Sequence, residues 1–110
     1  MISWEEFNKI DFRAGTIVKS EGFEGARDPA LKLWIDFGPN WGIKRSSAQI
    51  TQHYSTTDLI GKQVICVTNL PAKQIANFMS EVLVTGFPDE NGNVVLITTD
   101  KLVPNGVKLF

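Results

Sequence analysis

The sequence predicts an all-β fold, a small barrel that forms one domain over residues 1–110. Three observations carry this prediction. Apolar and polar residues alternate in several short segments, as they do in strands with one buried face. Glycine, proline and asparagine turn signals separate these segments. A chain of 110 residues also buries enough apolar surface to fold around one core without a metal or a disulfide.

The first elements are a short helix and a strand. Ser3 and Glu6 have the S-x-x-E spacing of a capping box, which predicts a short helix reaching Ile10. The hydrophobic period then changes to two over Phe12–Lys19, as expected for a strand. Gly15 within that strand predicts a bulge or a sharp bend.

Two further strands follow a loop over residues 21–29. The clearest alternation in the chain covers Leu31–Phe37, and the turn residues Gly38–Asn40 end it. A third strand is expected from Trp41 and contains the polar run Ile43–Thr51. Ser55–Gly61 has an N-cap residue at its start and a glycine at its end, which predicts a short helix.

The second half of the chain contains three more predicted strands. Gln63–Asn69 is a continuous apolar strand, and Leu70–Ser80 is a long connection. Val82–Phe87 and Val94–Thr98 flank an Asn-Gly hairpin signal, before a final turn at Pro104–Gly106. This order, with a short helix between the third and fourth strands, fits a five-stranded Greek-key barrel of the OB type.

Composition and charge exclude several classes of protein. The chain has 11 Lys and Arg and 12 Asp and Glu, for a net charge of -1, so it does not bind nucleic acid through bulk positive charge. Its single cysteine, Cys66, lies in an apolar run and forms no disulfide within the chain, so a reducing, cytoplasmic setting is expected. No apolar run is long enough for a membrane helix, and no membrane insertion is expected.

Catalytic motifs are missing from the sequence. There is no nucleophile elbow, phosphate-binding loop, dinucleotide fingerprint or zinc-ligand spacing. His53 is the only histidine, and we interpret it as a surface residue after the third strand. We therefore expect no enzyme activity, no cofactor and no metal site.

A polar, cationic surface is the main candidate for binding. Cations there would contact phosphates, while hydroxyl and amide groups would supply hydrogen bonds, as OB folds do with RNA. The alternative, equally compatible with composition, is a solvated face on which the two serines satisfy a strand end. The candidate residues are Lys44, Arg45, Ser46, Ser47, Gln49, Asn69, Lys73 and Gln74.

Large apolar side chains that do not follow the core pattern form a second candidate surface. Such groups often mark an interface. A homodimer interface is the simplest interpretation, and a peptide-binding groove is the alternative. The residues are Trp4, Phe7, Trp34, Phe78, Met79, Leu109 and Phe110.

Four long motifs resemble the CsaA family: D-F-R-A-G-T-I (Asp11–Ile17), A-R-D-P-A-L-K-L-W-I-D-F-G (Ala26–Gly38), I-K-R-S-S-A-Q-I-T (Ile43–Thr51) and M-S-E-V-L-V-T-G-F (Met79–Phe87). That family is similar in turn to the tRNA-binding domain of methionyl-tRNA synthetase extensions. The resemblance implies an OB-fold homodimer whose terminal extensions support dimerisation. It also implies an ATP-independent chaperone, related to protein export, that binds unfolded or precursor proteins.

The alternative that the wider resemblance implies is a tRNA-binding protein. The N-L-x-P segment and the basic residues of that domain fall on Asn69–Gln74, where Lys73 is the one cation. Its S-x-G-M motif falls on Ser80–Leu83, which reads S-E-V-L. The resemblance thus adds Ser80 to the candidate binding residues and shows a negative charge, Glu81, beside it.

Overall fold

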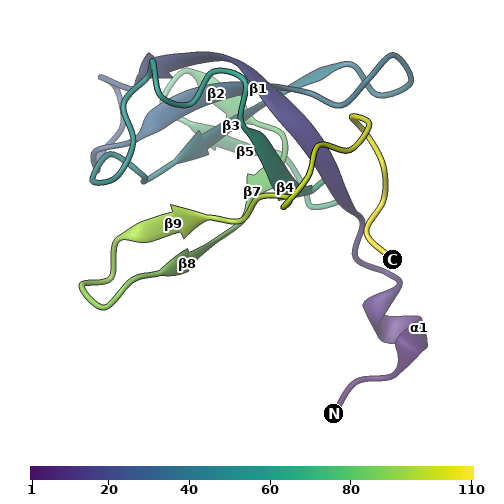
Figure 1. Cartoon of the computed structure of the whole chain (residues 1–110). Coiled ribbons are helices and arrows are strands. Elements are labelled where there is room, and N and C mark those ends of the chain that lie inside the picture. The colour runs from purple at the N-terminus through teal and green to yellow at the C-terminus, as the bar shows by residue number, and fades with distance from the viewer.

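The computed structural model describes every residue from Met1 to Phe110 and contains one helix and nine strands. In chain order these are α1 (Trp4–Phe7), β1 (Phe12–Gly22), β2 (Leu31–Asp36), β3 (Ile43–Ala48), β4 (Gln63–Val67), β5 (Lys73–Ile75), β6 (Phe78–Ser80), β7 (Leu83–Val84), β8 (Gly86–Pro88) and β9 (Val94–Leu96). Figure 1 shows the barrel at the top, the β8–β9 hairpin below it, and α1 projecting away.

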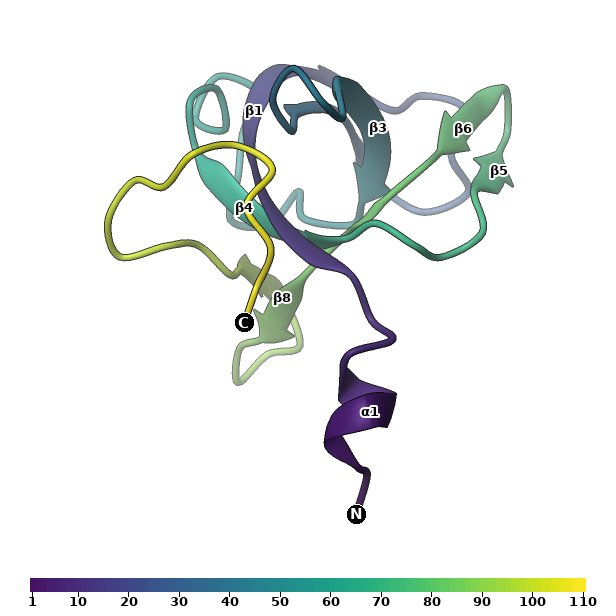
Figure 2. The same ribbon diagram turned by 90° about the vertical axis from the view of Figure 1, so that its right-hand side faces the viewer.

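Five strands form the barrel. They are ordered β3-β2-β1-β4-β7, and each neighbouring pair is antiparallel. The two edges meet where the amides of Glu81 and Val82 donate to the carbonyl of Arg45, at 2.8 and 3.3 Å. In Figure 2 the strands curve around a ring, with β1, β3 and β4 at its circumference. The predicted all-β barrel of the OB type is confirmed.

The predicted alternation of β2 places its apolar residues in the core. Leu33, Ile35 and the following Phe37 are almost completely buried. Gly15 packs closely against these side chains. A Cβ atom at that position would stand only 2.6 Å from Ile35 Cγ2. The bulge predicted at Gly15 lies instead at Val18, where the register of β1 against β2 shifts. Gly15 therefore allows close packing inside the barrel.

The predicted helix between β3 and β4 is wrong, because this segment consists of turns. The Ser55 hydroxyl accepts from the Asp58 amide at 3.2 Å, and the Asp58 carboxylate accepts from the Ser55 amide at 3.3 Å. Gly61 then has a φ of 89°, which ends any helix at once. Leu59 of this segment is nevertheless fully buried and belongs to the hydrophobic core.

The predicted connection Leu70–Ser80 contains the β5–β6 hairpin, which the sequence did not indicate. Its strands have only three residues each, too few to show a period of two. The predicted strand Val82–Phe87 divides at Thr85, whose amide and hydroxyl both donate to the Ile65 carbonyl. β7 therefore completes the barrel, while β8 pairs with β9 outside it.

The C-terminal segment returns to the start of β1. The Gly106 amide donates to the Ala14 carbonyl at 2.7 Å, and the Leu109 amide donates to the Phe12 carbonyl at 2.9 Å. These bonds fix the last residues along the barrel. No helix of the structure has the length and apolar character needed to cross a bilayer.

Candidate functional site

The predicted polar run of β3 is divided between two faces of the barrel wall. Lys44 and Ser46 are paired with Ile35 and Leu33 of β2, and so they point toward the interior. Arg45 is paired with the outward-facing Trp34. Ser46 is buried, and its hydroxyl donates to the Val82 carbonyl at 2.7 Å, so it stabilises barrel closure. Lys44 and Arg45 therefore cannot serve one ligand surface as neighbours.

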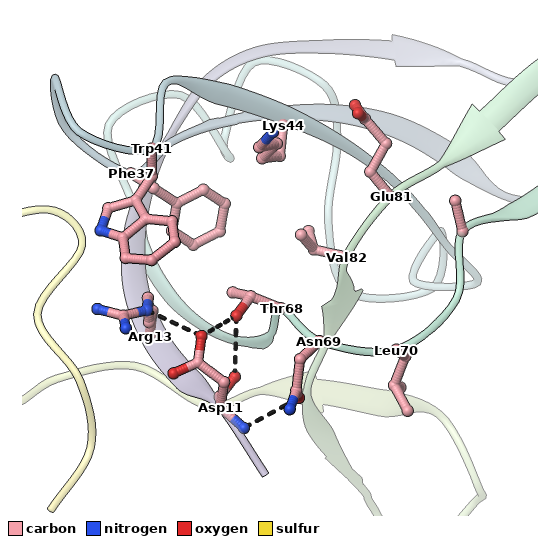
Figure 3. A pocket seen from close by; sticks show the side chains of 11 residues that line it. Asp11, Arg13, Phe37, Trp41, Lys44, Thr68, Asn69, Leu70, Glu81 and Val82 are labelled. Atoms are coloured by element: carbon pink, nitrogen blue, oxygen red, sulfur yellow. Dashed lines mark hydrogen bonds and ion pairs between the residues drawn. The ribbon is translucent and has the colours of Figure 1, made fainter. Parts of the chain in front are cut away.

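Lys44 points into a cavity of about 390 Å³ at one end of the barrel, which we call the mouth pocket. Figure 3 shows apolar side chains on its walls and charged groups around its rim. Pockets of this size and mixed lining are typical of ligand sites. The lining residues are Asp11, Arg13, Phe37, Trp41, Lys44, Thr68, Asn69, Leu70, Ala72, Glu81 and Val82.

Arg13 and Asp11 neutralise one another at the rim of the mouth pocket. The Arg13 Nε atom lies 2.9 Å from the Asp11 carboxylate, and its Nη1 atom donates to the Gly106 carbonyl at 2.8 Å. The guanidinium lies 4.1 Å from the centroid of the Trp41 ring, in cation–π geometry. Lys44 makes no ion pair within 4.0 Å, so its ammonium group is free to meet a ligand.

The environment of Asp11 favours its charged form. Burial opposes ionisation, but hydrogen bonds from Thr68 and Arg13 and the positive charges of Arg13 and Lys108 outweigh it, so the pKa of Asp11 lies below its ordinary value. A carboxylate with a lowered pKa in the folded state stabilises the fold at neutral pH. That contribution is lost as the pH falls through this lowered pKa.

Asn69, a predicted binding residue, is engaged by the protein itself. Its Oδ1 atom accepts from the Asp11 amide at 3.0 Å, and its Nδ2 atom donates to the Lys9 carbonyl at 2.6 Å. The side chain thus joins the end of β4 to the segment between α1 and β1. Asn69 lines the mouth pocket but already uses both polar ends to hold this segment.

Three aromatic rings on the outside of the barrel form what we call the outer aromatic cluster: Phe23, Trp34 and Phe78. The Phe78 ring meets the other two edge to face, at centroid distances of 5.5 and 5.6 Å. Lys19 lies 4.5 Å from the Trp34 ring, and Arg45 lies 5.4 Å from the Phe78 ring. Phe78 is only 5% exposed, so this predicted interface residue is enclosed by its own chain.

The remaining predicted polar residues meet beside this cluster. Ser80 of β6 accepts from the Ser47 amide of β3 at 3.2 Å, which fixes the β5–β6 hairpin against the barrel. Ser47, Gln49, Lys73 and Gln74 line one cavity of about 360 Å³ next to the hairpin. The structure therefore brings together five predicted residues on the outer side, and places Lys44 and Asn69 in the mouth pocket.

Sequence reasoning missed the residues that complete the mouth pocket. Asp11 and Arg13 are a carboxylate and a cation two residues apart in the sequence, at the start of β1. Trp41 was visible as an aromatic residue after a turn, and it is 46% exposed. These segments are distant in the sequence and meet only at one end of the closed barrel. The pocket could therefore be found only by someone who already knew the barrel topology.

The single histidine and the single cysteine, His53 and Cys66, show no sign of a catalytic role. His53 Nε2 lies 2.7 Å from the Asp89 carboxylate, joining the segment after β3 to the β8–β9 turn. This hydrogen bond lowers the pKa of Asp89. Burial raises the pKa of the Cys66 thiol to about 12, which makes it a poor nucleophile. No group of three metal-ligating side chains is present.

Comparison with known proteins agrees with this architecture. Residues 12–108 match the family described as a putative tRNA binding domain. The crystal structure of the chaperone CsaA from Bacillus anthracis has 48% identity and a TM-score of 0.93, covering 100% of this chain and 99% of that one. The CsaA chaperone protein from Picrophilus torridus has 49% identity and a TM-score of 0.92, with both chains covered completely.

Relatives also occur within larger enzymes. The methionine–tRNA ligase of Methanocaldococcus jannaschii is 35% identical over 92% of this chain, and ligase 1 of Bacillus anthracis is 34% identical over 98%. The chain spans only 15 to 16% of the length of these ligases. The matched part is the tRNA-binding domain and not the catalytic part. The chain therefore belongs to the putative tRNA binding domain family and, within it, to the CsaA family.

Proposed function

We propose that this protein is an ATP-independent chaperone of the CsaA type, related to protein export, that binds unfolded or precursor polypeptides in the cytoplasm. The observation that carries this proposal is the mouth pocket, whose walls include Phe37, Trp41, Leu70 and Val82. Two solved structures named as CsaA chaperones, at 48 and 49% identity, support it.

The chemistry of the mouth pocket suits an extended polypeptide. Its apolar walls would take one or two apolar side chains, whose transfer from water supplies the binding free energy. At the rim, the Lys44 ammonium could donate to a backbone carbonyl, and the Glu81 carboxylate could accept from a backbone amide. Such contacts would recognise the backbone and the apolar side chains of a client without depending on one particular sequence. A chaperone needs this broad specificity.

Replacing Leu70 with aspartate should weaken this activity at least tenfold, measured as the protein concentration that halves the aggregation of a denatured client. Leu70 lines the mouth pocket and is 49% exposed, so a charge there opposes apolar binding with little effect on folding. Ile60→Asp is the matched control, because Ile60 is 51% exposed but lies among the turns between β3 and β4. Equal effects of the two substitutions would contradict the proposal.

We further propose that the protein is a homodimer joined through its terminal segments. Trp4 is 83% exposed on the projecting helix α1, and Leu109 and Phe110 are exposed near the C-terminus. Large exposed apolar groups of this kind are typical of interfaces. Light scattering should give twice the chain mass, and Trp4→Asp should give the mass of one chain; a wild-type monomer would refute the dimer.

RNA binding is the second candidate function, and the outer face favours it. Lys19, Lys32 and Arg45 surround the outer aromatic cluster, and Lys73 lies on the neighbouring hairpin. Cations near aromatic rings are common on OB-fold surfaces that bind nucleic acid. The family description, a putative tRNA binding domain, supports the same candidate. Lys73→Ala should reduce the salt dependence of tRNA binding by about one phosphate contact.

A further inference from the structure

Glu81 occupies the closing edge of the barrel, between the mouth pocket and the outer face. Its amide donates to the Arg45 carbonyl at 2.8 Å, and its Oε1 atom accepts from the Arg45 amide at 3.0 Å. The carboxylate thus takes the place of a strand partner for an edge amide of β3. It is held in position by backbone contacts that any side chain at position 45 would leave intact.

The same carboxylate oxygen also reaches the side chain of Arg45. The Arg45 Nε atom lies 3.4 Å from Glu81 Oε1, while the guanidinium lies 5.4 Å from the Phe78 ring. This ion pair is partly exposed, with side chains 42% and 32% accessible, so its contribution to stability is small. Its main consequence is electrostatic, because the charge of Arg45 is neutralised on the outer face.

The other cations of the outer face differ in whether they have an ion-pair partner. Lys19 has an ion-pair partner, Glu21, at 3.5 Å. Lys32 and Lys73 have no ion pair within 4.0 Å. With both Arg45 and Lys19 paired, the outer face has a weaker positive field than its count of cations implies. A polyanion would therefore meet a carboxylate beside Arg45.

We propose that Glu81 is a specificity-determining residue that disfavours RNA on the outer face by neutralising Arg45. This inference rests on the proposed chaperone function, for which exclusion of abundant RNA would keep the protein available to polypeptides. A negative charge near a phosphate site costs roughly one order of magnitude in affinity at low salt. Removing that charge should therefore convert a weak RNA binder into a stronger one.

Glu81→Gln is the substitution that isolates the charge. The glutamine carbonyl oxygen can still accept from the Arg45 amide, so barrel closure is retained. Glu90→Gln is the control, because it changes the net charge equally at an exposed site in the β8–β9 turn. Melting temperature verifies folding, and fluorescence anisotropy with a labelled tRNA transcript, at salt concentrations from about 50 to 200 mM, measures binding.

We expect Glu81→Gln to bind the transcript about tenfold more tightly at the lowest salt, with a salt slope steeper by about one phosphate. Glu90→Gln should stay within twofold of the wild type. Adding Arg45→Gln to the Glu81→Gln variant should remove the gain, because Arg45 is the group released. An equal gain in Glu90→Gln, no gain, or a gain that survives Arg45→Gln would overturn the proposal.

The client aggregation assay separates this inference from the function on which it rests. If the wild type fails to protect a denatured client, the proposed chaperone function fails, whatever the RNA measurements give. If the wild type protects the client but Glu81→Gln binds RNA no better, the function stands and the role of Glu81 is wrong. The two failures are therefore distinguishable in one set of purified proteins.

Discussion

Gln63→Leu should lower the free energy of unfolding by about 3 kcal/mol, the larger of the two stability effects that we expect. Gln63 is 6% exposed, and its amide group bonds to the C-terminal segment from both ends. Nε2 donates to the Val103 carbonyl at 2.7 Å, while Oε1 accepts from the Val103 amide and the Thr99 hydroxyl, both at 3.0 Å. Leucine has a similar size but leaves these partners without hydrogen bonds.

Thermal and denaturant unfolding measure this effect, which corresponds to a fall in melting temperature of about 15 °C. Gln52→Leu is the control, since Gln52 is exposed in the turn after β3 and should change stability by less than about 0.5 kcal/mol. Amide exchange at Val103 should also become faster, because its bond to Gln63 is lost. Equal stability of the two variants would show that the C-terminal segment is held by other contacts.

Gly15→Ala should lower the free energy of unfolding by about 2 kcal/mol through overpacking. The added methyl group would stand 2.6 Å from Ile35 Cγ2 and 2.8 Å from Phe37 Cε1, well inside contact distance. Both neighbours are almost completely buried core residues, so the added methyl group would have to displace packed side chains. β1 would have to shift away from β2, or both side chains would have to leave their rotamers.

Gly22→Ala provides the matched comparison for that substitution. Gly22 ends the same strand, but a Cβ atom added there would have no other atom within 4 Å beyond its chain neighbours. Alanine there should leave stability unchanged or raise it slightly, because it restricts the unfolded chain. Urea denaturation of both variants checks the difference. A similar loss for Gly22→Ala would mean that strand propensity, and not packing, explains the effect at Gly15.

The barrel strands could be predicted because each carries its own pattern. Leu31–Phe37 alternates over a full strand, and the core side of β2 followed directly. The β5–β6 hairpin could not be predicted, since three-residue strands show no period and its turn includes Ala76 at a φ of 52°. The helix predicted at Ser55–Gly61 failed because side-chain bonds to the backbone can form turns as readily as caps.

The sequence predicted which residues belong to the candidate site, but not how they are arranged on the faces of the barrel. Lys44 and Arg45 are adjacent in the sequence, and strand alternation, applied to them, would have placed them on opposite faces. The mouth pocket depends on Arg13, Trp41 and Leu70, which come from different strands and loops. Only the closure of the barrel brings these together. The resemblance of the motifs identified the family, but it did not show which face serves which ligand.

The three tryptophans provide the most direct test, because each indole reports one surface. Trp41 lies in the mouth pocket, Trp34 in the outer aromatic cluster, and Trp4 on α1. In ¹⁵N-labelled protein, an unfolded, reduced client should shift the Trp41 indole resonance and leave that of Trp34 unchanged. A shift of Trp34 with Trp41 unchanged would contradict the central claim that the mouth pocket binds polypeptide.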